Sequence, residues 1–198
     1  MHLNSKLLFG KFARPLINAG TTVLEIGPDQ LPSTYQLSCA GFREWATADL
    51  YARPGLTYQF TSDHRMPVAD DSYDIVLSGQ VLEHVRKPWE WIAELVRVCK
   101  PGGHVITIAP VSWPYHEAPI DCWRVYPEGM RALLEGLPVE ILTNQFLSME
   151  TSLERQFLIP GRSQSDQGRK QRLAARLLGR LGVPFECAFD LICIARKL

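Results

Sequence analysis

The sequence predicts a doubly wound, Rossmann-like α/β fold with a mostly parallel sheet, and three observations support this prediction. Short runs rich in β-branched and aromatic residues alternate with segments of helical periodicity. The run "YDIVLSG" (Tyr73–Gly79) has a nearly continuous apolar centre, which is typical of a parallel strand covered on both faces. The length of 198 residues, with 46% hydrophobic and 21% charged residues, suits one such domain. We therefore expect a single domain over residues 1–198.

The pattern predicts the elements in order. A helical segment occupies residues 1–20, with its helix over Leu3–Asn18. Strands are predicted at Thr22–Ile26, Glu44–Leu50, Leu56–Phe60, Tyr73–Gly79, His104–Ala109, Val139–Thr143 and Ala188–Ala195. Further helices are predicted at Ser33–Cys39, from Pro88 to Cys99, and at Pro127–Glu135.

The helix that starts at Pro88 has the clearest signals. Proline suits a first helical turn, where its missing N–H costs nothing. Apolar residues then recur at helical spacing, at Trp89, Ile92, Val96 and Cys99. The run "KPGG" (Lys100–Gly103) ends the helix, because glycine supplies a left-handed cap and proline cannot continue it.

The overall charge excludes some classes of function. Lysine plus arginine equals aspartate plus glutamate at 21 each, so no global field attracts nucleic acid, and no nucleic-acid motif is present. Lys6, Lys11 and Arg14 interrupt the apolar residues at the N-terminus, unlike a signal peptide. No apolar run is long enough to span a bilayer, and the five cysteines form no C-x-x-C pair. We expect a cytoplasmic protein with reduced thiols and no metal site.

The loop after the first strand, "VLEIGPDQL" (Val23–Leu31), resembles half of a dinucleotide-binding loop. Gly27 lets the backbone pass close to a ligand, but Asp29 and Leu31 stand where later glycines of such a loop would be expected. Glu25 and Asp29 would repel a pyrophosphate and tolerate a positively charged ligand. The loop therefore argues against a nicotinamide dehydrogenase.

Two further acids follow strands. Asp49 ends the second strand, at the spacing where doubly wound folds hold a ribose by its hydroxyls. Asp63 follows the third strand, where it could accept from an adenine amino group or cap a turn.

Several motifs in sequence then resemble one family. "VLEIGP", "ATADL" and the stretch from "DDSYDIVLS" through "LEHV" to "KPGG" and "HVITIAP" are similar to class I S-adenosylmethionine-dependent methyltransferases, in particular the type 11 small-molecule subgroup. The resemblance covers Val23 to Pro110. It implies a seven-stranded sheet whose last strand is antiparallel, and S-adenosylmethionine as cofactor.

The resemblance also implies which residues bind the cofactor. Glu25 would contact the amino end of the methionine moiety, Asp49 the ribose hydroxyls and Asp63 the adenine amino group. The full set is Glu25, Gly27, Asp49, Leu50, Asp63, His64, Ser78, Gly79 and Gln80.

The acceptor side is expected in the loop over residues 110–126. His84 and His116 are the candidate bases, because histidine titrates near neutral pH; a structural role for each stays open. Aromatic and polar side chains in the loop suit a sugar ring or an aromatic acceptor, or else a small core that packs the loop. These substrate candidates are Trp113, Tyr115, Asp121, Trp123 and Arg124.

Beyond the loop, residues 150–170 are polar and turn-rich, and we expect a mobile loop there. The following helix, Arg169 to Leu181, carries arginines in steps of four and a row of leucines. The arginines are Arg172, Arg176 and Arg180. One interpretation is peripheral contact with a membrane; we favour the other, a solvated helix packed on the sheet through its leucines.

Together these observations predict methyl transfer from S-adenosylmethionine to a small acceptor, with a hydroxyl on a sugar, surface glycan or glycolipid favoured. Methylation of a quinone, aromatic or natural-product hydroxyl is the alternative enzyme. A non-catalytic binding or scaffold protein that retains the fold is the alternative from another class.

Overall fold

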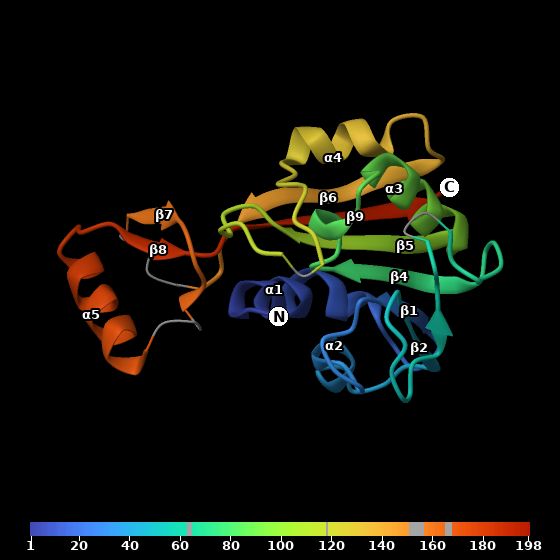
Figure 1. Ribbon diagram of the computed structural model, residues 1–198, viewed down its shortest axis with the longest axis horizontal. Coiled ribbons are helices and arrows are strands. Elements are labelled where there is room, and N and C mark those ends of the chain that lie inside the picture. Colours follow the sequence, from blue (N-terminus) through green and yellow to red (C-terminus); the bar gives the residue numbers. More distant parts are fainter. Residues whose placement is uncertain (63–64, 118, 151–156, 165–167) are drawn as a thin grey trace.

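A computed structural model describes residues 1–62, 65–117, 119–150, 157–164 and 168–198. Seven strands form one sheet in the order β3-β2-β1-β4-β5-β9-β6 (Figure 1). The strands are β1 (Thr22–Ile26), β2 (Glu44–Asp49), β3 (Tyr58–Gln59), β4 (Tyr73–Gly79), β5 (Cys99–Pro110), β6 (Val139–Leu147) and β9 (Asp190–Lys197).

The sheet confirms the predicted fold class. Strands β3, β2, β1, β4 and β5 pair in parallel, whereas β9 lies antiparallel to both β5 and β6. From β1 the chain moves outward to β2 and β3, then returns to add β4 on the other side of β1. The carboxyl ends of β1 and β4 therefore flank the point where the strand order reverses, which is where doubly wound folds bind ligands.

Helical segments cover both faces of the sheet (Figure 1). They are α1 (Leu3–Leu8), a π-helical turn (Phe9–Ala13), a 3₁₀ turn (Arg14–Leu16), α2 (Thr34–Leu37), a second 3₁₀ turn (Leu82–His84), α3 (Pro88–Val98) and α4 (Pro127–Leu134). One buried cluster joins the sheet to α3 and α4 through residues such as Trp91 and Met130. A second lies on the other face, under Leu8, Phe9 and Tyr35.

Three elements differ most from the prediction, and the others agree to within a few residues. The N-terminal helix divides into α1 and two irregular turns, the last of which contains Pro15. Strand β5 already begins at Cys99, one residue before "KPGG", and therefore includes that run; Gly102 there has the left-handed φ of 78° that was predicted. Strand β6 extends to Leu147, because β9 pairs with it up to that residue.

A small unit lies beyond the carboxyl edge of the main sheet (Figure 1). It consists of β7 (Leu158–Pro160), α5 (Arg169–Arg180) and β8 (Phe185–Cys187), with β7 and β8 paired in parallel. Strand β7 falls within the predicted loop over residues 150–170. Residues 151–156 and 165–167 of that range lie outside the described residues.

The preferred interpretation of α5 was wrong. Its leucines are exposed and belong to neither buried cluster, so α5 does not pack on the main sheet through them. Among the described residues, no helix combines the length and apolar character needed to cross a membrane.

Candidate functional site

Two cavities adjoin at the carboxyl ends of β1, β2 and β4. The larger has a volume of about 360 Å³ and the smaller about 230 Å³. Both are lined by Gly27, Gln80 and His84, so they meet at the turn after β1. The meeting point coincides with the reversal in strand order, as the fold predicts.

Two glycines near this meeting point have no space for a side chain. Gly27 has φ of 67°, and a Cβ there would lie 2.6 Å from Val81 Cγ2. At Gly79 a Cβ would lie 2.7 Å from the ring of Tyr35, which packs beneath the end of β4. Any larger side chain at either position would collide with its neighbours, so the chain needs glycine at both.

Glu25 is placed differently from the expectation. It is 1% exposed and lines neither cavity; its carboxylate accepts hydrogen bonds from Ser33 Oγ and, at 2.8 Å, from Trp45 Nε1. Burial raises its pKa to about 7, against the lowering effect of these two donors. Glu25 is therefore only partly charged near neutral pH, and its contacts brace the first turn from inside.

Asp29 takes the position that was expected for Glu25, at the wall of the larger cavity. Its two oxygens accept from the Thr34 backbone N–H at 3.0 Å and from Thr34 Oγ1 at 2.6 Å. Partial burial would raise the pKa of Asp29, but these hydrogen bonds outweigh it and hold the pKa below its usual value. The fixed negative charge at this turn is thus that of Asp29, not a pair of charges.

The smaller cavity combines one carboxylate with apolar walls. Asp49 and Leu50, two of the predicted cofactor-binding residues, line it together with Phe60 and Trp91. The carboxylate of Asp49 accepts from the Tyr51 backbone N–H at 3.2 Å and forms an ion pair with Arg53. An acid beside flat apolar surfaces is a suitable environment for a nucleoside.

Arg53 was not predicted, and it ties two parts of the site together. Besides its ion pair with Asp49, it donates to the carbonyl oxygen of Pro28 at 2.6 Å. The end of β2 is thereby linked to the turn after β1. No local pattern in the sequence indicated this pair, because residues 50–53 are irregular rather than helical.

The remaining cofactor candidates are distributed as follows. Asp63 and His64 lie outside the described residues. Ser78 is fully buried and lines neither cavity, whereas Gly79 and Gln80 line the larger one. Gln80 adopts φ of 60°, a conformation that side chains rarely take.

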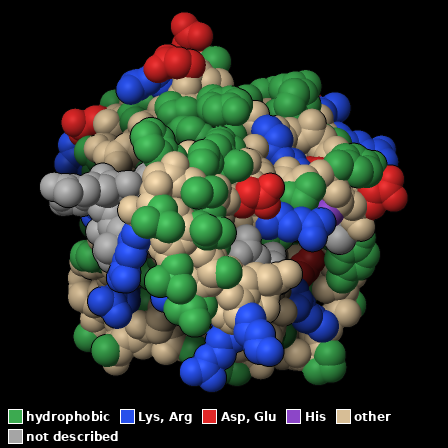
Figure 2. All heavy atoms as spheres, turned by 90° about the vertical axis from the view of Figure 1, so that its left-hand side faces the viewer, with side chains coloured by type: hydrophobic (Ala, Val, Ile, Leu, Met, Phe, Trp, Pro, Cys, Tyr) green, Lys and Arg blue, Asp and Glu red, His purple; other side chains and the backbone are tan. Residues whose placement is uncertain are grey.

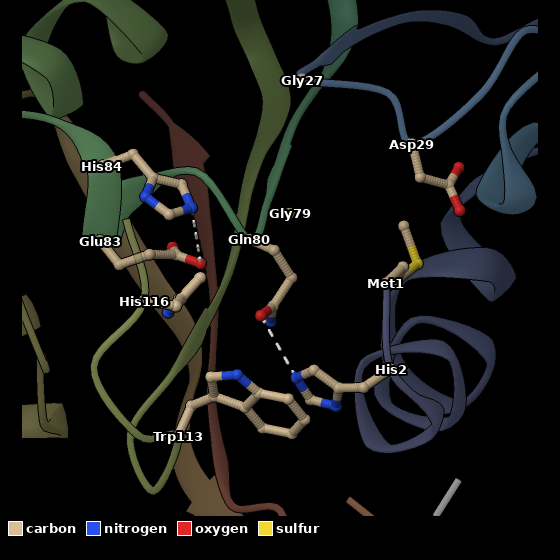
Figure 3. A pocket seen from close by; sticks show the side chains of 10 residues that line it. All are labelled: Met1, His2, Gly27, Asp29, Gly79, Gln80, Glu83, His84, Trp113 and His116. Atoms are coloured by element: carbon tan, nitrogen blue, oxygen red, sulfur yellow. Dashed lines mark hydrogen bonds and ion pairs between the residues drawn. The ribbon is translucent and has the colours of Figure 1, made fainter. Parts of the chain in front are cut away.

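His84, His116 and a residue that the sequence reasoning missed, Glu83, form a cluster at the larger cavity (Figure 3). Glu83 is 2% exposed, and its Oε1 lies 3.6 Å from His84 Nε2. The rings of His84 and His116 meet edge to face, with centroids 5.1 Å apart. Glu83 precedes His84 in "LEHV", but nothing in the sequence showed that a short 3₁₀ turn would bury it.

The surroundings of His84 determine which ring nitrogen carries its proton and whether the ring is charged. Its Nδ1 donates to the carbonyl oxygen of Ile120, which leaves Nε2 as the unprotonated nitrogen. Burial lowers the pKa of His84 below its usual value, so the ring is neutral at pH 7. Burial also raises the pKa of Glu83 to about 8. The cluster therefore holds a neutral imidazole beside a protonated carboxyl group.

A cation could in principle use the same three side chains, because one ligand atom from each lies within 4.8 Å of the others. The expectation of no metal dependence stays a prediction.

The predicted substrate-binding residues of the loop after β5 differ in position: one lines the larger cavity and the others do not. Trp113 lines the larger cavity, and its ring stacks on that of His2 with centroids 4.8 Å apart (Figure 3). Tyr115 is exposed and donates to Glu117 at 2.6 Å, outside the described walls of both cavities. Trp123 donates to the Val85 carbonyl at 2.7 Å and packs against the buried cluster.

Asp121 and Arg124 hold the loop rather than line a cavity. Arg124 binds Asp121 through two nitrogens, at 2.6 Å for Nη2, and donates to the Trp113 carbonyl at 3.1 Å. This pairing lowers the pKa of Asp121 to about 2. Asp121 also accepts from the His116 backbone N–H at 2.9 Å. Their observed role is thus to position Trp113 and His116, as the packing alternative for this loop anticipated.

The N-terminal segment also contributes to the site, which the sequence did not indicate. His2 Nε2 lies 3.2 Å from Gln80 Oε1 (Figure 3). The same nitrogen lies 3.2 Å from Asp190 Oδ1. Asn4 donates to the same fully buried Asp190 at 2.6 Å. Residues from the two ends of the chain therefore fix the side chain of Gln80.

Comparison with known proteins agrees with this architecture. A family model described as a methyltransferase domain matches residues 10–107. An uncharacterized methyltransferase of Mycobacterium bovis is 37% identical over 97 residues, which is 49% of this chain and 34% of that protein. The match thus spans about a third of the length of this curated relative.

Solved structures share the fold. An S-adenosylmethionine-dependent methyltransferase from Mesorhizobium loti has a TM-score of 0.57 at 15% identity, covering 93% of this chain and 95% of its own. Another from Methanosarcina mazei has a TM-score of 0.60 at 14% identity, with 95% and 97% covered. Residues 10–107 thus match the methyltransferase-domain family, and the chain shares the fold of these solved S-adenosylmethionine-dependent methyltransferases.

Proposed function

We propose that this protein transfers a methyl group from S-adenosylmethionine to a hydroxyl group of a small acceptor, with a sugar, surface-glycan or glycolipid hydroxyl favoured. The observation that carries the proposal is the meeting of a polar and a largely apolar cavity at Gly27. A ligand with an amino-acid end and an adenosine end needs two such compartments, joined where no Cβ intrudes.

Each compartment suits one end of the cofactor. In the smaller cavity, Asp49 would accept from the ribose hydroxyls while Leu50 and Phe60 pack against the adenine. In the larger cavity, Asp29 would face the ammonium of the methionine moiety, a role that passes to it because Glu25 is enclosed. Asp29 keeps its charge near neutral pH, as such a role requires.

The chain's own part in the reaction is to align the acceptor and take its proton. The cofactor supplies a methyl group activated by the sulfonium. His84 Nε2 carries the lone pair that would accept the hydroxyl proton as the new O–C bond forms and the C–S bond breaks, with its electrons remaining on sulfur. His116, held by Asp121, lies beside it. A positioned base contributes typically about 10²–10⁴-fold to the rate.

The acceptor proposal is supported by Trp113, whose flat ring faces the larger cavity and suits the apolar face of a sugar. An acceptor screen that follows S-adenosylhomocysteine release would compare sugar and glycolipid hydroxyls with aromatic hydroxyls. Turnover of aromatic acceptors alone would favour the alternative enzyme. A cytoplasmic location remains part of the proposal.

The test of cofactor binding is calorimetry with S-adenosylhomocysteine on Asp49→Asn. We expect roughly 10–100-fold weaker binding, because hydrogen bonds to a charged group contribute about 1.5–3 kcal/mol. Asp71→Asn is the matched control: Asp71 is exposed in a turn with φ of 55°, which asparagine tolerates. No heat with the unsubstituted protein would contradict the function, and equal affinity of the two variants would remove Asp49 from the site.

A further inference from the structure

Helix α5 presents a row of leucines to solvent. Leu173, Leu177, Leu178 and Leu181 are 60%, 52%, 48% and 80% exposed. On a helix that packs against its own protein, leucines at such spacing face the interior. Here they lie outside both buried clusters, so this apolar face has no partner among the described residues.

The orientation of α5 leaves the leucines pointing away from the protein. Gly179 is buried, and Arg172 and Ala175 are half-buried, so these three mark the inward side. Residues two apart on a helix are separated by about 200° around its axis. Leu177 therefore points almost opposite to Gly179, and Leu173 and Leu181, four residues to either side, lie close to its direction.

Positive charge accompanies the leucines. Residues 157–187 contain six basic and two acidic residues, a net charge of +4 in a chain whose total is zero. Within α5 itself there are five basic residues and no acidic one: Arg169, Lys170, Arg172, Arg176 and Arg180. Figure 2 shows hydrophobic side chains gathered on this face of the molecule, with lysine and arginine side chains at several points around them.

We propose that α5 docks on an anionic lipid surface, with Leu173, Leu177 and Leu181 entering the interface and arginines contacting the lipid phosphates. The positive charge of the segment favours a lipid surface as the partner, because anionic lipids attract clustered lysine and arginine next to an apolar face. With 12 residues α5 spans only about 18 Å, so it lies on a bilayer rather than across it.

Docking through α5 would bring the catalytic edge of the sheet to the membrane. The β7–α5–β8 unit is joined to the loop after β5, since Ser112 Oγ donates to the Gly161 carbonyl at 2.9 Å and accepts from the Phe189 N–H at 2.8 Å. Trp113 follows Ser112 directly. The docking does not depend on the proposed methyl transfer; if both hold, an acceptor anchored in the lipid would meet the cavity at the surface.

The experiment is co-sedimentation of the full chain with vesicles. Phosphatidylcholine vesicles are compared with vesicles in which phosphatidylglycerol replaces part of the lipid. We expect binding to the anionic vesicles only. The double variant Arg169→Gln/Arg180→Gln should weaken it by roughly fivefold for each arginine. Leu173→Ser/Leu181→Ser should weaken it by on the order of tenfold for each leucine.

Matched controls make the same changes elsewhere. Arg14→Gln/Arg43→Gln and Leu37→Ser/Leu142→Ser also alter exposed side chains and should bind as the unsubstituted protein does. Circular dichroism and the thermal midpoint verify that every variant is folded.

Four results would overturn the proposal. One is no binding to anionic vesicles. The second is equal binding to both lipid compositions, and the third is equal loss in the control variants. The fourth is sedimentation of the free protein as a dimer that only the α5 leucine variant dissociates, with no vesicle binding; the face would then belong to a second copy of this chain.

Discussion

At the scale of single residues, the site combines carboxyl groups at the cavity walls with buried ones, of which Glu83 has the more strongly shifted pKa. Glu83 is 2% exposed and has a pKa of about 8, whereas its ordinary value is 4.5. The folded protein therefore retains this proton over a pH range in which the unfolded chain has released it. The stabilising contribution of Glu83 is complete below about pH 4.5 and is lost as the pH rises through about 8.

We predict that Glu83→Gln removes this pH dependence. The free energy of unfolding of the unsubstituted protein, relative to the variant, should fall between about pH 5 and pH 8, by roughly 1.4 kcal/mol for each unit of pKa difference. Urea unfolding at several pH values measures it. Glu90→Gln, at an exposed ion pair with Lys87, is the control. The difference in unfolding free energy between this variant and the unsubstituted protein should not change over the same pH range. Parallel profiles for Glu83→Gln and the unsubstituted protein would contradict the raised pKa.

At the scale of elements, the turn after β1 joins the sheet to both cavities. Its shape depends on Gly27, whose positive φ and contact with Val81 leave no space for a side chain. The same turn is held from the outside by Asp29, which caps α2 through Thr34, and by Arg53 on the Pro28 carbonyl. These contacts keep the turn in place without the later glycines of a dinucleotide loop.

We predict that Gly27→Ala weakens S-adenosylhomocysteine binding and lowers stability, because alanine at positive φ costs about 1–2 kcal/mol and its Cβ displaces Val81. Gly102→Ala is the control. Gly102 has φ of 78° but nothing lies within 4 Å of a Cβ there. Alanine at this position therefore has the backbone cost of a positive φ without any collision with a neighbouring side chain. Calorimetry should show normal binding for Gly102→Ala. If both variants lose binding equally, the local contact at Gly27 is not what shapes the site.

At the scale of the whole molecule, the buried core and the exposed apolar row of α5 belong to different parts of the chain. The two buried clusters lie on the faces of the seven-stranded sheet, under α3, α4 and the N-terminal helical segment. The leucines of α5 contribute to neither. We therefore expect the sheet and its helices to determine the thermal midpoint.

The comparison of Leu95→Ala with Leu177→Ala tests this division. Leu95 is fully buried in α3, and its truncation should cost about 2–5 kcal/mol of unfolding free energy. Leu177 is 52% exposed, and the same change should leave the free energy within about 0.5 kcal/mol. Denaturant unfolding measures both. A large loss for Leu177→Ala would mean that α5 packs on the protein after all.

Much of the fold followed from local signals that do not depend on distant residues. The apolar run of β4, Pro88 at the start of α3 and the glycines of "KPGG" each specify their element through backbone geometry or burial. The same reasoning placed Gly27 and Asp49 at cavities, because strand ends in a parallel sheet converge on one edge. Sequence alone therefore determined the fold class and the sheet edge at which the two cavities lie.

Only the tertiary structure decided which polar groups face the cavities. Glu25 and Asp29 carry the same charge in one turn, yet Ser33 and Trp45 enclose Glu25 and leave Asp29 at the wall. Likewise Arg124 binds Asp121 instead of lining a cavity. The leucines of α5 face solvent, although their spacing predicts a packed helix. The physical reason is that burial and hydrogen-bond partners come from residues far apart in the chain, and local periodicity records that a face is apolar without recording what lies against it.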